Sequence, residues 1–135
     1  DNMGPYVANE VSKLMTKKHI HVADSNILIM GLTFKENCPD LRNTRIVDMV
    51  HEFKKFNCNV DVYDPWVNKD EALKEYDINP IDNPVENKYD AVVIAVAHDK
   101  FQELSFDQIK SYCKENYVLY DIKHLLDSNQ VDGRL

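Results

Sequence analysis

Glycine is scarce in this chain of 135 residues, which contains only three glycines, and long apolar runs are lacking altogether. No stretch approaches the roughly 18 apolar residues of a transmembrane helix, so the sequence predicts no membrane span. A self-sufficient dinucleotide site is also disfavoured, because its fingerprint needs three closely spaced glycines. The P-loop pattern is missing too, since no G-K-[ST] follows a glycine-rich run.

Basic residues and cysteines are few as well. Sixteen lysines and arginines stand against 23 acidic residues, and the formal net charge is −7, whereas nucleic-acid binders usually carry a positive surplus. The cysteines Cys38, Cys58 and Cys113 are odd in number and lack C-x-x-C spacing, which argues against a disulfide framework or a structural metal site. The first residues do not resemble a signal peptide. We therefore predict a cytoplasmic protein with ordinary thiols and no nucleic-acid, membrane or metal partner.

Apolar segments alternate with amphipathic ones along the whole chain. Short apolar runs that suit buried strands lie at residues 26–34, 59–65, 89–98 and 117–123. Helical spacing of apolar residues marks residues 5–19, 44–56, 68–76 and 106–112. This alternation predicts an α/β, Rossmann-like, three-layer domain with a parallel sheet and helices on both faces. Ligands of such sheets bind beyond the carboxyl ends of the strands, where the strand order reverses.

The stretch "GLTFKENCPDLRNT", residues 31–44, follows the first strand and leads into a helix. It holds one glycine, and Lys35, Arg42 and Arg45 cluster near the helix start. Cations are unfavourable there because the helix dipole is already positive. A bound anion would resolve the conflict, but so would neutralisation by nearby acidic residues in a solvated loop. The charge pattern alone leaves both explanations open.

The same stretch resembles the C-terminal domain of the UDP-glucose/GDP-mannose dehydrogenase family, which carries G-x-x-F-K-x-x-x-x-D-x-R at this turn. The segments "DNMGPYVANEVSKLM", "VDVYDP", "YDAVVIAVAHDKFQEL" and "VLYDIKHLLD" also resemble the family and occur in its order. Within the family, "FKENCPDLRNT" and "AVAHD" are most similar to the branch that acts on UDP-N-acetyl-glucosamine or -galactosamine. The resemblance covers nearly the whole chain.

The resemblance implies part of an enzyme that oxidises the C6 alcohol of a UDP-sugar to a carboxylate with two NAD⁺, in surface polysaccharide biosynthesis. NAD would be bound mainly by a missing N-terminal domain, and the catalytic cysteine would also lie outside this chain, which is expected to be inactive alone. Residues 1–22 would end the helix from a missing central domain, and residues 23–135 would form the UDP-binding domain. The parent is expected to be a homodimer, and Val7, Val11 and Leu14 are expected to be partly exposed.

Four residues match the family's binding positions. The resemblance implies that Phe34 and Lys35, its F-K pair, contact the UDP-sugar. Lys123 also falls at a substrate-binding position, where glucose-type members often have arginine. Arg42 matches an arginine on the cofactor-facing side of the cleft. No residue of this chain is expected to be catalytic.

Other chemically capable residues at the strand ends favour structural interpretations. His98 and Asp99 suit a loop, because the sequence shows no partner that would make the histidine a general base. Asp64 before a proline suits a strand terminator better than a metal ligand, and Trp66 suits packing better than base stacking. Cys38 lies near basic residues, but the family nucleophile belongs to a glycine-rich motif that this chain lacks.

Two other classes of protein share the alternating pattern. One is a non-enzymatic nucleotide-sensing or protein-interaction module with a Rossmann-like fold. The other is a phospho-accepting receiver domain, which needs clustered acidic residues after the first strand. That position leads to Lys35 instead, so we rank the receiver domain last.

Overall fold

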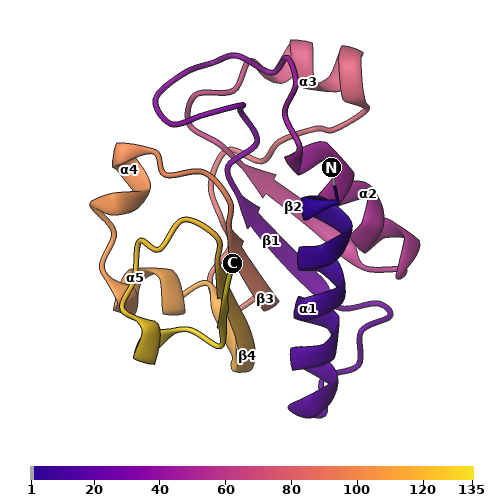
Figure 1. Cartoon of the computed structure of the whole chain (residues 1–135), viewed down its shortest axis with the longest axis vertical. Helices are drawn as coiled ribbons and strands as arrows, with labels where there is room; N and C mark the ends of the chain where they lie inside the picture. The colour runs from indigo at the N-terminus through magenta and orange to yellow at the C-terminus, as the bar shows by residue number, and fades with distance from the viewer. Residues whose placement is uncertain (1) are drawn as a thin grey trace.

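The computed structural model describes residues 2–135 and contains one five-stranded parallel sheet in the order β2-β1-β3-β4-β5. The strands are β1 (Asn26–Met30), β2 (Asn59–Tyr63), β3 (Tyr89–Ile94), β4 (Cys113–Asp121) and β5 (Gly133–Arg134). Helices cover both faces (Figure 1). The predicted α/β class with a parallel sheet is therefore confirmed, although β5 was not foreseen.

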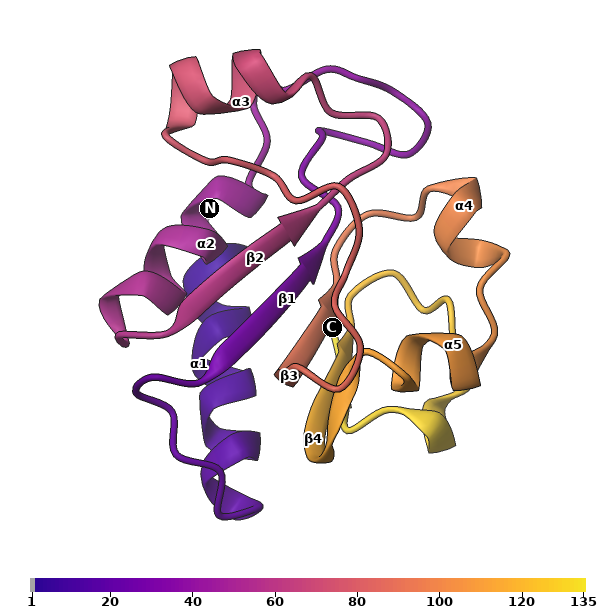
Figure 2. The same cartoon turned by 180° about the vertical axis from the view of Figure 1, so that it is seen from behind.

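Two helices cover one face of the sheet and two short helices cover the other (Figure 2). The helices are α1 (Met3–Lys17), α2 (Ile46–Lys55), α3 (Lys69–Tyr76), α4 (Asp99–Gln102) and α5 (Phe106–Lys110), with a 3₁₀ turn at Ser128–Gln130. α1 and α2 share one face, α4 and α5 the other, and α3 lies beyond the carboxyl ends of the strands. None of the helices described between residues 2 and 135 has the length and apolar character that crossing a bilayer requires.

The core consists of two apolar layers separated by the sheet. Successive strand side chains point to opposite faces, so β1 sends Ile27 and Ile29 toward α1 and α2 and sends Leu28 and Met30 toward α4 and α5. All four side chains are fully buried. Burying each one contributes roughly 1.5–3 kcal/mol, which explains why β1 reads as a continuous apolar run.

Helix α1 is an integral part of this core. Val7 and Val11 are fully buried, so the expectation that they are partly exposed was wrong for these two residues. Leu14 is partly exposed, as expected, and packs against the same cluster. The helix approaches α2 closely at Gly4, where an added Cβ would lie 2.7 Å from a backbone nitrogen of α2. The assignment of residues 1–22 to a linking helix stays a prediction, but their helix packs on this domain.

The C-terminal segment folds back onto the sheet although its sequence carries few structural signals. β5 pairs in parallel with the end of β4, with Gly133 beside Tyr120. Lys18 Nζ lies 2.7 Å from Asp132 Oδ1 and ties the returning segment to the end of α1. The fold-back brings Leu135 to the carboxyl end of the sheet.

Candidate functional site

Gly31 allows the chain to leave β1 through a tight turn. Its φ is +110°, a conformation that favours glycine, and an added Cβ would lie 2.5 Å from Val96 Cβ. The missing side chain therefore makes room for the loop after β3. With its single glycine, this turn does not supply the three-glycine fingerprint of a self-sufficient dinucleotide site. It also ends β1 at Met30, short of the predicted boundary at residue 34.

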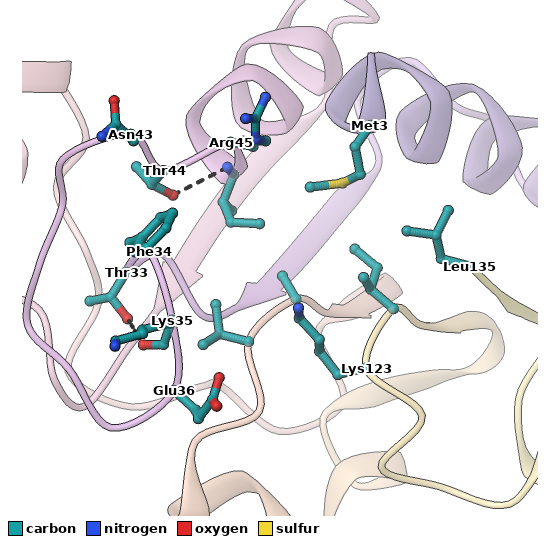
Figure 3. A pocket seen from close by; sticks show the side chains of 14 residues that line it. Met3, Thr33, Phe34, Lys35, Glu36, Asn43, Thr44, Arg45, Lys123 and Leu135 are labelled. Atoms are coloured by element: carbon teal, nitrogen blue, oxygen red, sulfur yellow. Dashed lines mark hydrogen bonds between the residues drawn. The ribbon is translucent and has the colours of Figure 1, made fainter. Parts of the chain in front are cut away.

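A pocket of about 250 Å³ opens at the carboxyl ends of β1, β3 and β4 (Figure 3). β1 and β3 flank the point where the strand order reverses, which is where open α/β sheets bind their ligands. The lining comes from the turn after β1, the start of α2, the loops after β3 and β4, and both ends of the described chain. The lining residues are Met3, Thr33, Phe34, Lys35, Glu36, Asn43, Thr44, Arg45, Ile46, Ala95, Val96, Ile122, Lys123 and Leu135.

The pocket is electropositive. Among residues 2–135, the lining contributes three cationic side chains, Lys35, Arg45 and Lys123, and one carboxylate side chain, Glu36. Figure 3 shows Lys35 and Glu36 on one side and Lys123 across from them. The first turn of α2 also lines the pocket, and the N–H groups and dipole at such a helix start attract anions. The arrangement suits a phosphate-bearing ligand.

Thr44 fixes the start of α2 against the end of β1. Its hydroxyl donates to the Leu32 carbonyl at 2.6 Å and accepts the Ile46 N–H at 3.3 Å. Arg45 is the N-cap residue, and its side chain makes no capping hydrogen bond. The side-chain contacts of Thr44 therefore hold the helix terminus at the pocket edge.

The structure brings together three of the four residues that the resemblance singled out. Phe34, Lys35 and Lys123 all line the pocket. Phe34 is 52% exposed and is therefore not a core residue. Their contacts with a ligand stay a prediction. Arg45, Met3 and Leu135 join the lining; the misplaced charge of Arg45 was the only sequence signal among them.

Arg42 does not line this pocket. Its Nε and Nη2 donate to the two carboxylate oxygens of Asp40, each at 3.0 Å, and its side chain is highly exposed. These hydrogen bonds hold the pKa of the Asp40 carboxyl below its usual value. Local neutralisation thus accounts for Arg42, and its role toward a cofactor stays a prediction.

His98 has a buried partner that the sequence did not reveal. Its Nε2 lies 2.9 Å from Asp64 Oδ2, and both side chains are 0% exposed. The Asp64 carboxylate also accepts the N–H groups of Leu32, Thr33 and Trp66, at 2.7, 3.0 and 2.8 Å. Burial alone would raise the pKa of Asp64, but the hydrogen bonds from His98, Leu32 and Thr33 outweigh it and lower the pKa. Asp64 thus ends β2 by capturing backbone donors, as a strand terminator would.

Trp66 and the three cysteines do not form a second site among residues 2–135. Trp66 is 43% exposed and its ring centroid lies 6.5 Å from that of His98. Cys38 is half-buried, whereas Cys58 and Cys113 are buried and all three are free thiols. Among residues 2–135 no three histidine, cysteine or acidic side chains gather closely enough to hold a metal ion.

Comparison with known proteins shows the family to which the chain belongs. Residues 28–128 match the UDP-binding domain of the UDP-glucose/GDP-mannose dehydrogenase family. The chain is 48% identical over 135 residues to UDP-N-acetyl-D-glucosamine 6-dehydrogenase of Pseudomonas aeruginosa and 47% identical to that of Salmonella typhi, covering 100% of this chain and 32% of each relative. The structure of NDP-N-acetyl-D-galactosaminuronic acid dehydrogenase from Methanosarcina mazei Go1 matches with a TM-score of 0.84 and 23% identity, over 96% of this chain and 27% of that one. The chain, which spans about a third of its curated relatives, therefore belongs to the UDP-glucose/GDP-mannose dehydrogenase family through its UDP-binding domain.

Proposed function

We propose that the chain binds the UDP part of a UDP-N-acetylhexosamine as one portion of an NAD-dependent 6-dehydrogenase. The parent would oxidise the C6 alcohol of the sugar to a carboxylate. The observation that carries this proposal is the meeting of Phe34, Lys35 and Lys123 in one electropositive pocket at the start of α2. High identity to two UDP-N-acetyl-D-glucosamine 6-dehydrogenases supports the sugar class.

Each pocket residue has a distinct part in this proposal. Lys35 and Lys123 are compact cations suited to phosphate oxygens, and they reach the pocket from opposite sides. The N–H groups at the start of α2 add neutral donors for the same oxygens. Phe34, half exposed at the rim, supplies an apolar wall for the ring portions of the ligand.

The chemical step is assigned to segments outside this chain. The turn at Gly31 lacks the three-glycine fingerprint of a dinucleotide site, so the N-terminal domain of the parent would hold the cofactor, which accepts the electrons of the oxidation. The relatives' remaining two thirds would also supply the nucleophilic cysteine. A homodimeric parent, a cytoplasmic location and a role in surface polysaccharide biosynthesis stay predictions of the family resemblance.

Calorimetric titration of the chain with UDP tests the proposal. A hydrogen bond to a charged group is worth roughly 1.5–3 kcal/mol, so Lys35→Ala should weaken binding about tenfold or more. Lys54→Ala is the matched control, because Lys54 is an exposed lysine on α2 outside the pocket. Equal affinities for Lys35→Ala and the control would remove Lys35 from the site. NADH production by the chain alone would contradict the assignment of chemistry to other segments.

A further inference from the structure

The loop that carries Phe34 and Lys35 is held at both ends by one buried network. At its start, Asp64 Oδ2 accepts the Leu32 and Thr33 N–H groups. At its end, His98 Nδ1 accepts the Asn37 N–H at 3.0 Å. Asp64 directly follows β2, and His98 ends the loop between β3 and α4. The network therefore joins the segments that follow three strands.

The geometry fixes the tautomer of His98. Nδ1 accepts a hydrogen bond from a backbone N–H and therefore carries no proton. The ring proton is on Nε2, which donates to the Asp64 carboxylate at 2.9 Å. The Thr33 hydroxyl also lies 3.3 Å from Nε2. It donates to the Lys35 carbonyl at 3.2 Å, so its oxygen is available as a second acceptor for the Nε2 proton (Figure 3).

The position of the His98 imidazole is fixed by contacts of its backbone and its ring. His98 is the N-cap of α4, and its carbonyl accepts the N–H groups of Phe101 and Gln102 at 2.9 and 3.1 Å. Its ring packs against Phe101 in an edge-on arrangement with centroids 5.3 Å apart. Full burial keeps water from replacing its hydrogen bonds.

The other contacts of Asn37 reinforce the link to the same loop. Asn37 adopts a positive φ of 55°, and its side-chain oxygen accepts the Asp99 N–H at 3.0 Å. Asn37 is therefore tied to His98 through its backbone N–H and to the first residue of α4 through its side chain. Lys35, between these anchors, is exposed and has its carbonyl bound by Thr33.

We infer that His98 is a positioning residue for the UDP pocket: it fixes the loop of residues 33–37 so that Phe34 and Lys35 face the ligand. It is not among the lining residues of the pocket. It acts directly on the Asn37 N–H and, through the Thr33 hydroxyl, on the Lys35 carbonyl. The expected effect of His98 on UDP binding rests on the proposed function. Its expected effect on the conformation of the loop is independent of any ligand.

Two variants separate the two ring nitrogens. His98→Leu removes both hydrogen bonds at similar size. His98→Asn places a carboxamide oxygen near the position of Nδ1 and keeps an acceptor for the Asn37 N–H. Amide hydrogen exchange is followed by NMR in the 135-residue chain, with buried amides of β1 and β3 as the internal control for folding. Imidazole ¹⁵N shifts of the wild-type chain report the tautomer directly.

The expected result is the Nε2–H tautomer and Asn37 exchange at least about tenfold faster in His98→Leu, with β1 and β3 unchanged and with recovery in His98→Asn. UDP binding should weaken about two- to tenfold in His98→Leu, the range of one or two neutral hydrogen bonds. In the Lys35→Ala background, His98→Leu should weaken UDP binding by a smaller factor, because both residues act on the contact between Lys35 and the ligand.

The inference is overturned if the ring proton is on Nδ1, or if His98→Leu leaves Asn37 exchange unchanged. Should His98→Leu lose β1 and β3 protection as well, His98→Asn decides: fast Asn37 exchange in a folded His98→Asn chain also overturns it. Absence of UDP binding by the wild-type chain contradicts the proposed function instead, and the exchange measurements still decide the role of His98.

Discussion

Replacing Asp64 with asparagine tests how strongly the strand ends depend on one buried carboxylate. Asp64 accepts hydrogen bonds from His98 and from the N–H groups of Leu32, Thr33 and Trp66. An asparagine oriented with its oxygen in place of Oδ2 keeps three of these bonds, now uncharged, and turns its NH₂ group toward the Trp66 N–H. Charge-assisted bonds are roughly twice as strong as neutral ones, and an unsatisfied donor costs about 1–3 kcal/mol. After relief of carboxylate burial, we expect Asp64→Asn to lower the free energy of unfolding by about 2–5 kcal/mol.

Urea unfolding followed by circular dichroism measures this change. With a slope of about 1–3 kcal/mol per M, the midpoint should fall by roughly 1 M or more. Asp70→Asn is the control, because Asp70 is an exposed acid in the first turn of α3 and should change the free energy of unfolding by less than about 1 kcal/mol.

The pH dependence has a definite sign. The pKa of Asp64 is lowered in the folded chain, so its stabilisation is fully present above the unfolded pKa and is lost as the pH falls through the folded pKa. The difference between wild type and Asp64→Asn should therefore shrink in acid below about pH 4. Equal midpoints for wild type and Asp64→Asn at pH 7 would refute the reasoning.

Two further predictions concern the Gly31 turn and the thiols. Gly31→Ala should destabilise the chain by on the order of 1–3 kcal/mol in urea unfolding, because its φ is +110° and an added Cβ would clash with Val96; a midpoint within error of wild type would contradict this. At neutral pH a thiol reagent such as DTNB should modify Cys38 at least about tenfold faster than the buried thiols, because burial raises the pKa of Cys58 and raises that of Cys113 to about 12. Equal rates for all three, or modification of Cys113 first, would show that this burial does not protect it.

Apolar patterning was sufficient to predict four of the five strands and the edge of the sheet at which the pocket lies. β1 and β3 are buried on both faces, so residues 27–30 and 91–94 are uninterrupted apolar runs, and both strands were predicted correctly. The ends of both strands were predicted too late. β1 ends early because Gly31 turns the chain and Asp64 captures the N–H groups of Leu32 and Thr33. The family resemblance and the α/β class are confirmed by the comparisons.

Contacts between distant segments were beyond the reach of the sequence. His98 and Asp64 are 34 residues apart, and nothing local to either residue indicates the other. Leu135 reaches the pocket only because β5 returns beside β4. For Arg42 the sequence left two explanations open, since charge order along a loop does not show where a side chain points. In the structure, the Arg42 guanidinium pairs with Asp40 of the same loop.

In the turn after β1, buried residues that stabilise the fold are followed directly by exposed residues that line the pocket. Leu32 and Thr33 are buried and satisfied by Asp64, whereas residues 34–36 are solvent-facing and line the pocket. A change at one of these outward positions alters the pocket lining without entering the core. Under the proposed function, exchanging these three neighbouring side chains should alter ligand binding while the scaffold beneath them keeps its shape.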